Sequence, residues 1–252
     1  MMNNIYRWDD SGYRVQDIEL GLDLSDTIFF PKLPKQGDMF DSAHFDLQID
    51  DLERWIKIAT MYEGKKHGLS QEFFLDGKIK WEGGYKKNLL HGPSRFFSPS
   101  GQLLSITWFF EGKEQGLSLQ YSLKGDLTGR LRYKDGNPHQ IQEYFYENGS
   151  IKSLIPYQMG SLHGEVLLYH ENGFIKRQVS YEYGQKHGLD RIFSDRGLVL
   201  DEGYYDKGSP CGIHLRRYVS GAIKEQIEYT SSKNGIYTRW KEDGSLIEER
   251  KE

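Results

Sequence analysis

Glycine recurs every 24 residues along most of this chain, and this period constrains the fold more than any single motif does. Two glycine ladders run in parallel, and one residue is lost between the last two positions of each. The first comprises Gly68, Gly92, Gly116, Gly164, Gly188, Gly212 and Gly235, with Gln140 in the fourth place, and the second comprises Gly77, Gly101, Gly125, Gly149, Gly173, Gly197, Gly221 and Gly244. A fixed period of this length predicts a repeat architecture in which each unit contacts mainly its neighbours.

Other columns of the repeat indicate the secondary structure. Odd-numbered apolar residues such as Leu69, Phe73, Ile79 and Tyr85 recur, and alternate residues of a strand share one face, so these predict a single aromatic face. Asn-Gly or Asp-Gly pairs between the apolar runs predict a tight hairpin turn, because both residues tolerate positive φ. The Gly-containing segment at 181–188 predicts a second, wider turn.

These patterns predict an all-β fold. We expect an elongated, twisted antiparallel meander of about eight 24-residue strand-turn-strand repeats over residues 61–252, preceded by an irregular segment at 1–60. In that first segment, residues 6–8 and 13–15 predict one hairpin, and residues 55–62 align with the second strand of a repeat. A proline-bearing loop occupies residues 29–34.

An acidic stretch follows this loop and includes Asp38, Asp41, Asp46, Asp50 and Asp51. Two interpretations stay open for it. It is either a solvated segment or a docking surface for a basic partner, whose approach it would speed electrostatically.

Apolar residues interrupt the polar even-numbered positions in two repeats. The second repeat has Phe96, Leu104, Ile106, Trp108 and Phe110, and the fourth adds Tyr144 and Leu154. Their parity predicts one contiguous apolar patch on the face opposite the aromatic ladder. Such a patch is either covered by residues 1–60 or forms part of a partner interface.

The repeat resembles the MORN (membrane occupation and recognition nexus) repeat, and most closely its bacterial variant. The segments YEYGQKHGLDRIFSDRGLV at 181–199 and YQMGSLHGEVLLYHENGFI at 157–175 carry the resemblance best, and it extends over residues 61–252. Bacterial proteins of the variant family are often grouped as antitoxins or immunity proteins of toxin systems. Eukaryotic relatives resemble scaffolds or lipid-contacting modules.

Five histidines form a further column, namely His67, His91, His139, His163 and His187. Successive members lie two strands apart, about 10 Å, so neighbours cannot share one zinc ion, and a turn or stacking role is expected. Cys211 stands in the same column and is interpreted as a substitution. Arg217 replaces a column aromatic, and we expect Tyr218 to take its place through a one-residue slip.

The formal net charge of −4 divides into −6 over residues 1–60 and +2 over the rest, which excludes a strong nucleic-acid footprint. With neither a long apolar run nor a secretory signal, a soluble cytoplasmic protein is expected. We expect no catalytic residue, cofactor or metal. The leading hypothesis is a non-enzymatic immunity or antitoxin protein that occludes a cognate toxin. The alternative is a MORN-type scaffold or membrane-associated, lipid-binding module.

Overall fold

The computed structural model describes residues 7–9, 12–17, 22–28, 45–231 and 234–251. Within these residues every regular element is a β-strand, which confirms the predicted all-β class. The chain divides into two compact units, Met1–Asn137 and Pro138–Glu252. The predicted division between an amino-terminal segment and a repeat array at residue 60 is a different kind of boundary and stays a prediction.

The first strands form a small antiparallel sheet of their own, in the order β1 (Arg7–Asp9), β2 (Gly12–Asp17) and β3 (Leu22–Ile28). Trp8 pairs with Tyr13, which confirms the predicted hairpin, and β3 adds a strand that the sequence did not predict. The expected loop at 29–34 and the candidate residues Asp38 and Asp41 lie outside the described residues.

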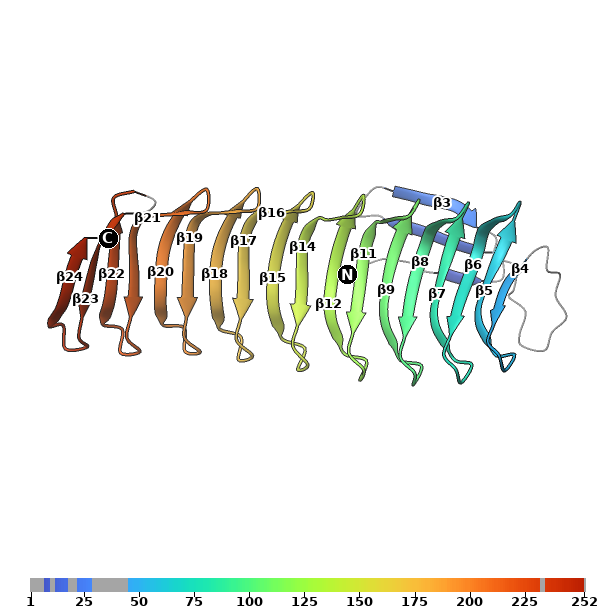
Figure 1. Cartoon of the computed structure of the whole chain (residues 1–252), viewed down its shortest axis with the longest axis horizontal. Helices are drawn as coiled ribbons and strands as arrows, with labels where there is room; N and C mark the ends of the chain where they lie inside the picture. The colour runs from blue at the N-terminus through green and yellow to red at the C-terminus, as the bar shows by residue number, and fades with distance from the viewer. Residues whose placement is uncertain (1–6, 10–11, 18–21, 29–44, 232–233, 252) are drawn as a thin grey trace. The chain divides into compact units, whose positions relative to one another are not determined.

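Each unit contains an open antiparallel meander whose strands lie side by side in chain order (Figure 1). The strands of the first unit are β4 (Phe45–Ile49), β5 (Trp55–Tyr62), β6 (Lys65–Phe73), β7 (Ile79–Lys86), β8 (Leu89–Phe97), β9 (Leu103–Phe110), β10 (Lys113–Glu114), β11 (Gly116–Tyr121) and β12 (Leu127–Lys134). The short β13 (Asn137–Pro138) lies at the boundary. Those of the second unit are β14 (Gln140–Phe145), β15 (Ile151–Gln158), β16 (Ser161–Leu162), β17 (Gly164–Tyr169), β18 (Ile175–Glu182), β19 (Gln185–Phe193), β20 (Val199–Asp206), β21 (Ser209–Arg217), β22 (Ile223–Tyr229), β23 (Gly235–Trp240) and β24 (Leu246–Lys251).

The two turns of each repeat are the reverse of the predicted ones. Tyr62 pairs with Lys65, so only two residues connect β5 to β6, and both have positive φ (49° at Glu63 and 71° at Gly64). This is the geometry of a type I′ hairpin turn. The Asp-Gly turn is the wider one, because the last pair of β6 and β7 leaves residues 74–78 as the loop.

In that wider turn only the glycine takes positive φ, 82° at Gly77. Asp76 contributes through its side chain, since its Oδ1 accepts a hydrogen bond from the Lys78 amide at 3.1 Å. The aspartate therefore caps a longer loop instead of occupying a left-handed position, which is why the dipeptide rule gave the wrong turn length.

The tight turns provide a direct test of this assignment. Gly184 has a φ of 82°, and a Cβ there would meet no other atom within 4 Å. Gly184→Ala is expected to lower the free energy of unfolding by about 1 kcal/mol through backbone strain alone. Gly184→Asn should cost only a few tenths of that, since Asn88 occupies the matching position of another repeat at a φ of 71°. Urea unfolding measures both, and equal losses would contradict the left-handed turn.

One extra residue at each wide turn changes which side chains share a face. Glu72 pairs with Trp81 and Phe73 with Ile79, which leaves one residue of β7 without a partner of its own. Residues paired across neighbouring strands project from the same face. Leu69 pairs with Gly84, whereas Tyr85 lies on the other face, so the prediction of a single aromatic face is wrong.

We call the two sides of each meander the tyrosine face and the opposite face. The tyrosine face has Tyr85 and the tyrosines at equivalent positions, and the opposite face has Leu69 and its equivalents. This definition holds in the second unit, where Tyr181 and Tyr205 pair with the ladder glycines Gly164 and Gly188.

The core of each meander lies along a central row of the tyrosine face. In the first unit this row includes Ala59, Ser70, Gly83, Ser94, Ser118 and Leu131, and in the second it includes Gln142, Val166, Val179, Asp190, Gly203 and His214; most of these side chains are buried. Two glycines of this row lie against large rings of neighbouring residues. A Cβ on Gly83 would lie 2.5 Å from the Trp81 ring, and one on Gly203 would lie 2.3 Å from the His214 ring. Each of these glycines therefore makes room for a specific large neighbour.

The opposite face differs between the units. In the first unit its inner positions are shielded from solvent, with Ile58 fully buried and Trp108 only 6% exposed, whereas Phe110 beside the tight turn is 40% exposed. In the second unit two apolar side chains of this face are open to solvent, since Tyr204, at the position equivalent to Trp108, is 52% exposed and Ile213, at the position equivalent to Leu69, is 47% exposed. The second unit thus presents apolar side chains on a face whose inner positions the first unit buries.

Candidate interaction surface

The predicted apolar patch of the second repeat is divided between the two faces. Phe96 lies on the tyrosine face, because it pairs with Trp81. Ile106, Trp108 and Phe110 lie on the opposite face. The prediction of one contiguous patch is wrong, since parity counted across the wide turn ignores the extra residue there.

The other residues predicted for the apolar patch are likewise not gathered on one face. Leu104 sits at the irregularity between the pairs formed by Leu103 and Ser105. Tyr144 pairs with Ser153 and Leu154 pairs with Glu143, so these two side chains also lie on different faces. Of the whole set, Phe96 and Phe110 are exposed, at 48% and 40%, and their role in binding a partner stays a prediction.

The three described aspartates of the acidic stretch differ in their surroundings. Asp46 on β4 and Asp51 are exposed. Asp50 instead structures its own loop, where its carboxylate accepts hydrogen bonds from the Leu52 and Arg54 amides and from the Arg54 guanidinium. The hydrogen bond from the Arg54 side chain holds the pKa of Asp50 below its usual value. The docking role of this stretch stays a prediction.

The histidine column serves the tight turns, as expected. The Nδ1 atoms of His91 and His139 accept long hydrogen bonds from the amides of Glu111 and Met159, the first residues of their adjacent turns. The His163 ring lies beside the Tyr183 ring, with centroids 5.1 Å apart. The described residues contain no group of three or more His, Cys, Asp or Glu side chains that could hold a metal ion.

Arg217 occupies the normal place of the column aromatic, and the expected slip to Tyr218 is wrong. Arg217 pairs with Ile223, with the same register shift that the other wide turns show. Its guanidinium donates to Glu202 at 2.5 Å, and Arg191 donates to the other oxygen of this carboxylate at 3.2 Å. The hydrogen bond from Arg217 contributes most to lowering the pKa of Glu202.

Tyr218 instead links two repeats. Its hydroxyl donates to the carbonyl oxygen of Trp240 at 2.9 Å, as the Tyr146 hydroxyl donates to Tyr169 at 2.7 Å. His170 stands in the same position of its repeat and lies 3.3 Å from the Phe193 carbonyl oxygen. These polar side chains therefore tie neighbouring wide turns together.

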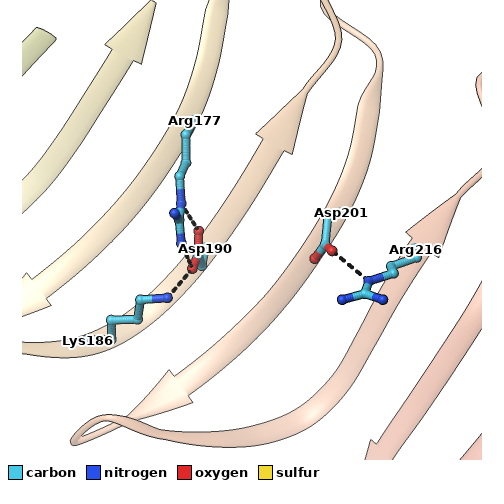
Figure 2. A network of polar contacts seen from close by, with 5 residues as sticks. All are labelled: Arg177, Lys186, Asp190, Asp201 and Arg216. Carbon is cyan, nitrogen blue, oxygen red and sulfur yellow. Dashed lines mark hydrogen bonds and ion pairs between the residues drawn. The ribbon is translucent and has the colours of Figure 1, made fainter.

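A buried ion cluster lies on the tyrosine face of the second unit (Figure 2). Arg177 donates two hydrogen bonds to Asp190, at 2.9 and 2.7 Å, and Lys186 donates a third at 2.6 Å. The Asp190 side chain is only 9% exposed. Burial alone would raise its pKa, and the hydrogen bonds and positive charges of Arg177 and Lys186 outweigh this, so the pKa lies below its usual value.

A second ionic group lies nearby in the same meander and is more exposed. Arg216 donates to Asp201 at 3.0 Å (Figure 2) and to Glu225 at 3.2 Å. These three residues are directly paired across β20, β21 and β22. Because the Arg216 side chain is 64% exposed, the group sets the charge pattern of the surface more than it stabilises the fold.

The sequence marked Arg216 and Arg217 only as basic residues that depart from the repeat pattern, and it did not point to Asp190. One signal was available for it. The equivalent positions of other repeats hold apolar or neutral polar residues, such as Ser94, Gln142 and Val166, so a carboxylate there breaks the column. The cations that neutralise Asp190 come from different columns, and only the structure shows that they converge.

On the opposite face of the second unit, exposed apolar side chains border a network of paired charges. Tyr204 on β20 and Ile213 on β21 stand next to the Glu202, Arg191 and Arg217 group on the same face. An exposed aromatic anchor beside satisfied charges is typical of a protein-binding surface. None of the described residues forms a helix that could cross a membrane.

Comparison with known proteins agrees with the repeat assignment in three places. The family model described as MORN repeat variant matches residues 90–111, 138–159 and 162–183. No curated protein matches the chain in sequence. A solved structure of the Photorhabdus luminescens Tc holotoxin pore shares 12% identity over 82% of this chain, with a TM-score of 0.19. This chain spans 14% of that pore chain, and so low a TM-score supports no conclusion. The three matched repeats and the antiparallel meanders together indicate a repeat scaffold.

Proposed function

We propose that this chain is an immunity or antitoxin protein of the cytoplasm, a non-enzymatic repeat scaffold that neutralises a cognate toxin by occluding it. MORN variant repeats at three places support a scaffold that binds another macromolecule. The observation that carries the proposal is the open face of the second unit, where Tyr204 and Ile213 are about half exposed.

Binding through this face follows the usual anatomy of protein interfaces. A large aromatic side chain and an aliphatic neighbour supply the apolar centre, and charged residues already paired within the chain surround it. The Glu202 carboxylate is already paired with Arg191 and Arg217, so a partner would meet no unpaired carboxylate there, and the group keeps a net charge of +1. Steric occlusion then requires only a rigid surface, which hydrogen-bonded strands provide.

The double variant Tyr204→Ala/Ile213→Ala tests the proposal against the product of the adjacent open reading frame. Loss of an aromatic anchor costs about 2 kcal/mol or more, which raises Kd roughly 30-fold. Protection of cells that express the partner should fall in parallel. Val219→Ala is the matched control, because Val219 is 76% exposed in a wide turn and should leave Kd unchanged.

Two results would count against this function. One is an adjacent gene product that is harmless to cells and does not bind the chain. The other is salt-sensitive flotation with anionic vesicles in the absence of any protein partner, which would favour a membrane-associated module.

A further inference from the structure

Several side chains on the opposite face of the first unit are deeply buried. Ile58 is 0% exposed, Thr60 5%, Leu69 9% and Trp108 6%. Side chains on the tyrosine face reach similar values between large neighbours of the same sheet, as Trp81 at 6% and Val179 at 4% show, so a second layer is inferred by comparing equivalent positions of the opposite face. Tyr204 occupies the position equivalent to Trp108 four repeats later. It is 52% exposed, which indicates how exposed an aromatic side chain is at this position when no second layer covers it.

We infer that the amino-terminal sheet of β1, β2 and β3 is this second layer and packs on the opposite face of the first unit. Within the described residues of that unit it is the sheet other than the meander. Its last strand ends at Ile28 and the meander begins at Phe45, so one connection joins the two layers.

The size of the amino-terminal sheet supports this inference. Its strands contain 3, 6 and 7 residues. Three strands this short cannot enclose a core by themselves and need an apolar surface to pack against. The first unit supplies such a surface, in the row that includes Leu69 and Trp108.

Charge complementarity points the same way. Residues 1–53 contain 12 acidic and 4 basic residues, a net charge of −8. Residues 54–137 contain 8 acidic and 14 basic residues, a net charge of +6. Opposite net charges draw the two segments together and disfavour contact of either one with its own copy in another molecule. On this inference the acidic stretch partly balances the positive charge of the repeats within the same chain.

Photo-crosslinking of the full-length chain tests the inference. The photoreactive residue p-benzoylphenylalanine replaces Trp108, which is buried on the opposite face, and mass spectrometry locates the crosslinked peptide. We expect crosslinks within residues 7–28 of the same chain. Leu69→p-benzoylphenylalanine provides a second position in the same row, should the first variant fail to fold. Tyr204→p-benzoylphenylalanine is the control and should give no crosslink to residues 7–28.

Crosslinks from positions 108 and 69 that fall only within residues 45–251 would overturn the inference. Crosslinks only between two chains would overturn it as well, because they would make a second copy the covering layer. The readout needs no toxin, so it is independent of the proposed function.

Discussion

Gly203→Ala is expected to lower the free energy of unfolding of the second unit by about 2–3 kcal/mol, the upper range for overpacking. The new Cβ would lie 2.3–2.5 Å from the Nδ1, Cε1 and Cγ atoms of His214. The imidazole cannot move aside, because it lies between the rings of Tyr205 and Tyr229, with centroids 5.1 and 4.8 Å away. Its Nε2 is also 2.8 Å from the Tyr204 carbonyl oxygen. Urea unfolding monitored by circular dichroism measures the loss.

A double-mutant cycle separates this clash from a general intolerance of the strand. Gly203→Ala in a His214→Ser background should cost much less than in the wild type, since the imidazole is gone. In the first unit Thr107 stands at the position of Gly203, and Ser118 stands at the position of His214. Their hydroxyl groups are 2.8 Å apart, so a side chain larger than glycine fits beside a serine there. Purely additive losses in the two backgrounds would refute the proposed steric coupling.

Asp190→Ala is expected to cost about 2–4 kcal/mol. Removing one partner of a buried ion pair costs about 3–5 kcal/mol, because the other charges lose their compensation. The estimate here is lower, since the Arg177 side chain keeps 35% of its surface and the Lys186 side chain 28%. Urea unfolding of the variant against the wild type gives the value. Asp201→Ala is the matched control in the exposed ion group and should cost below about 1 kcal/mol.

The pH dependence of stability provides a second measurement of the same carboxylate. Asp190 has a lowered pKa in the folded protein. Its contribution is therefore complete above the pKa of the unfolded chain, about 4, and is lost as pH falls through the lower folded-state pKa. The stability difference between wild type and Asp190→Asn should shrink from pH 7 to pH 3. A difference that stays constant over this range would show that the carboxylate charge is not the stabilising feature.

The repeat period predicted the strand-turn-strand unit and the fold class correctly, because glycine is favoured at many of the left-handed positions in the turns. Gly64 and Gly77 both occupy such positions, in different turns. The lengths of those turns were not predictable from the dipeptides alone. Asp76 acts through a side-chain hydrogen bond, and that interaction is compatible with several loop lengths.

The surface was harder to predict because a bulge changes every later assignment. One unpaired residue in β7 moves Tyr85 to the face opposite Leu69, and the same shift separates Phe96 from Trp108. Parity within one strand is reliable, but parity carried across a bulged hairpin is not. The Asp190 cluster was missed for another reason, since Arg177 and Lys186 reach it from two different strands.

The matching of glycine to a large neighbour along the central row limits how such an array can evolve. Gly83 accommodates Trp81 of its own strand, whereas Gly203 on β20 accommodates His214 on β21, so Gly203 suits one neighbour in one place. A duplicated repeat inserted beside a different neighbour would create either a cavity or a clash. Inserting or exchanging a repeat between β20 and β21 therefore requires a compensating substitution at the Gly203 or His214 position.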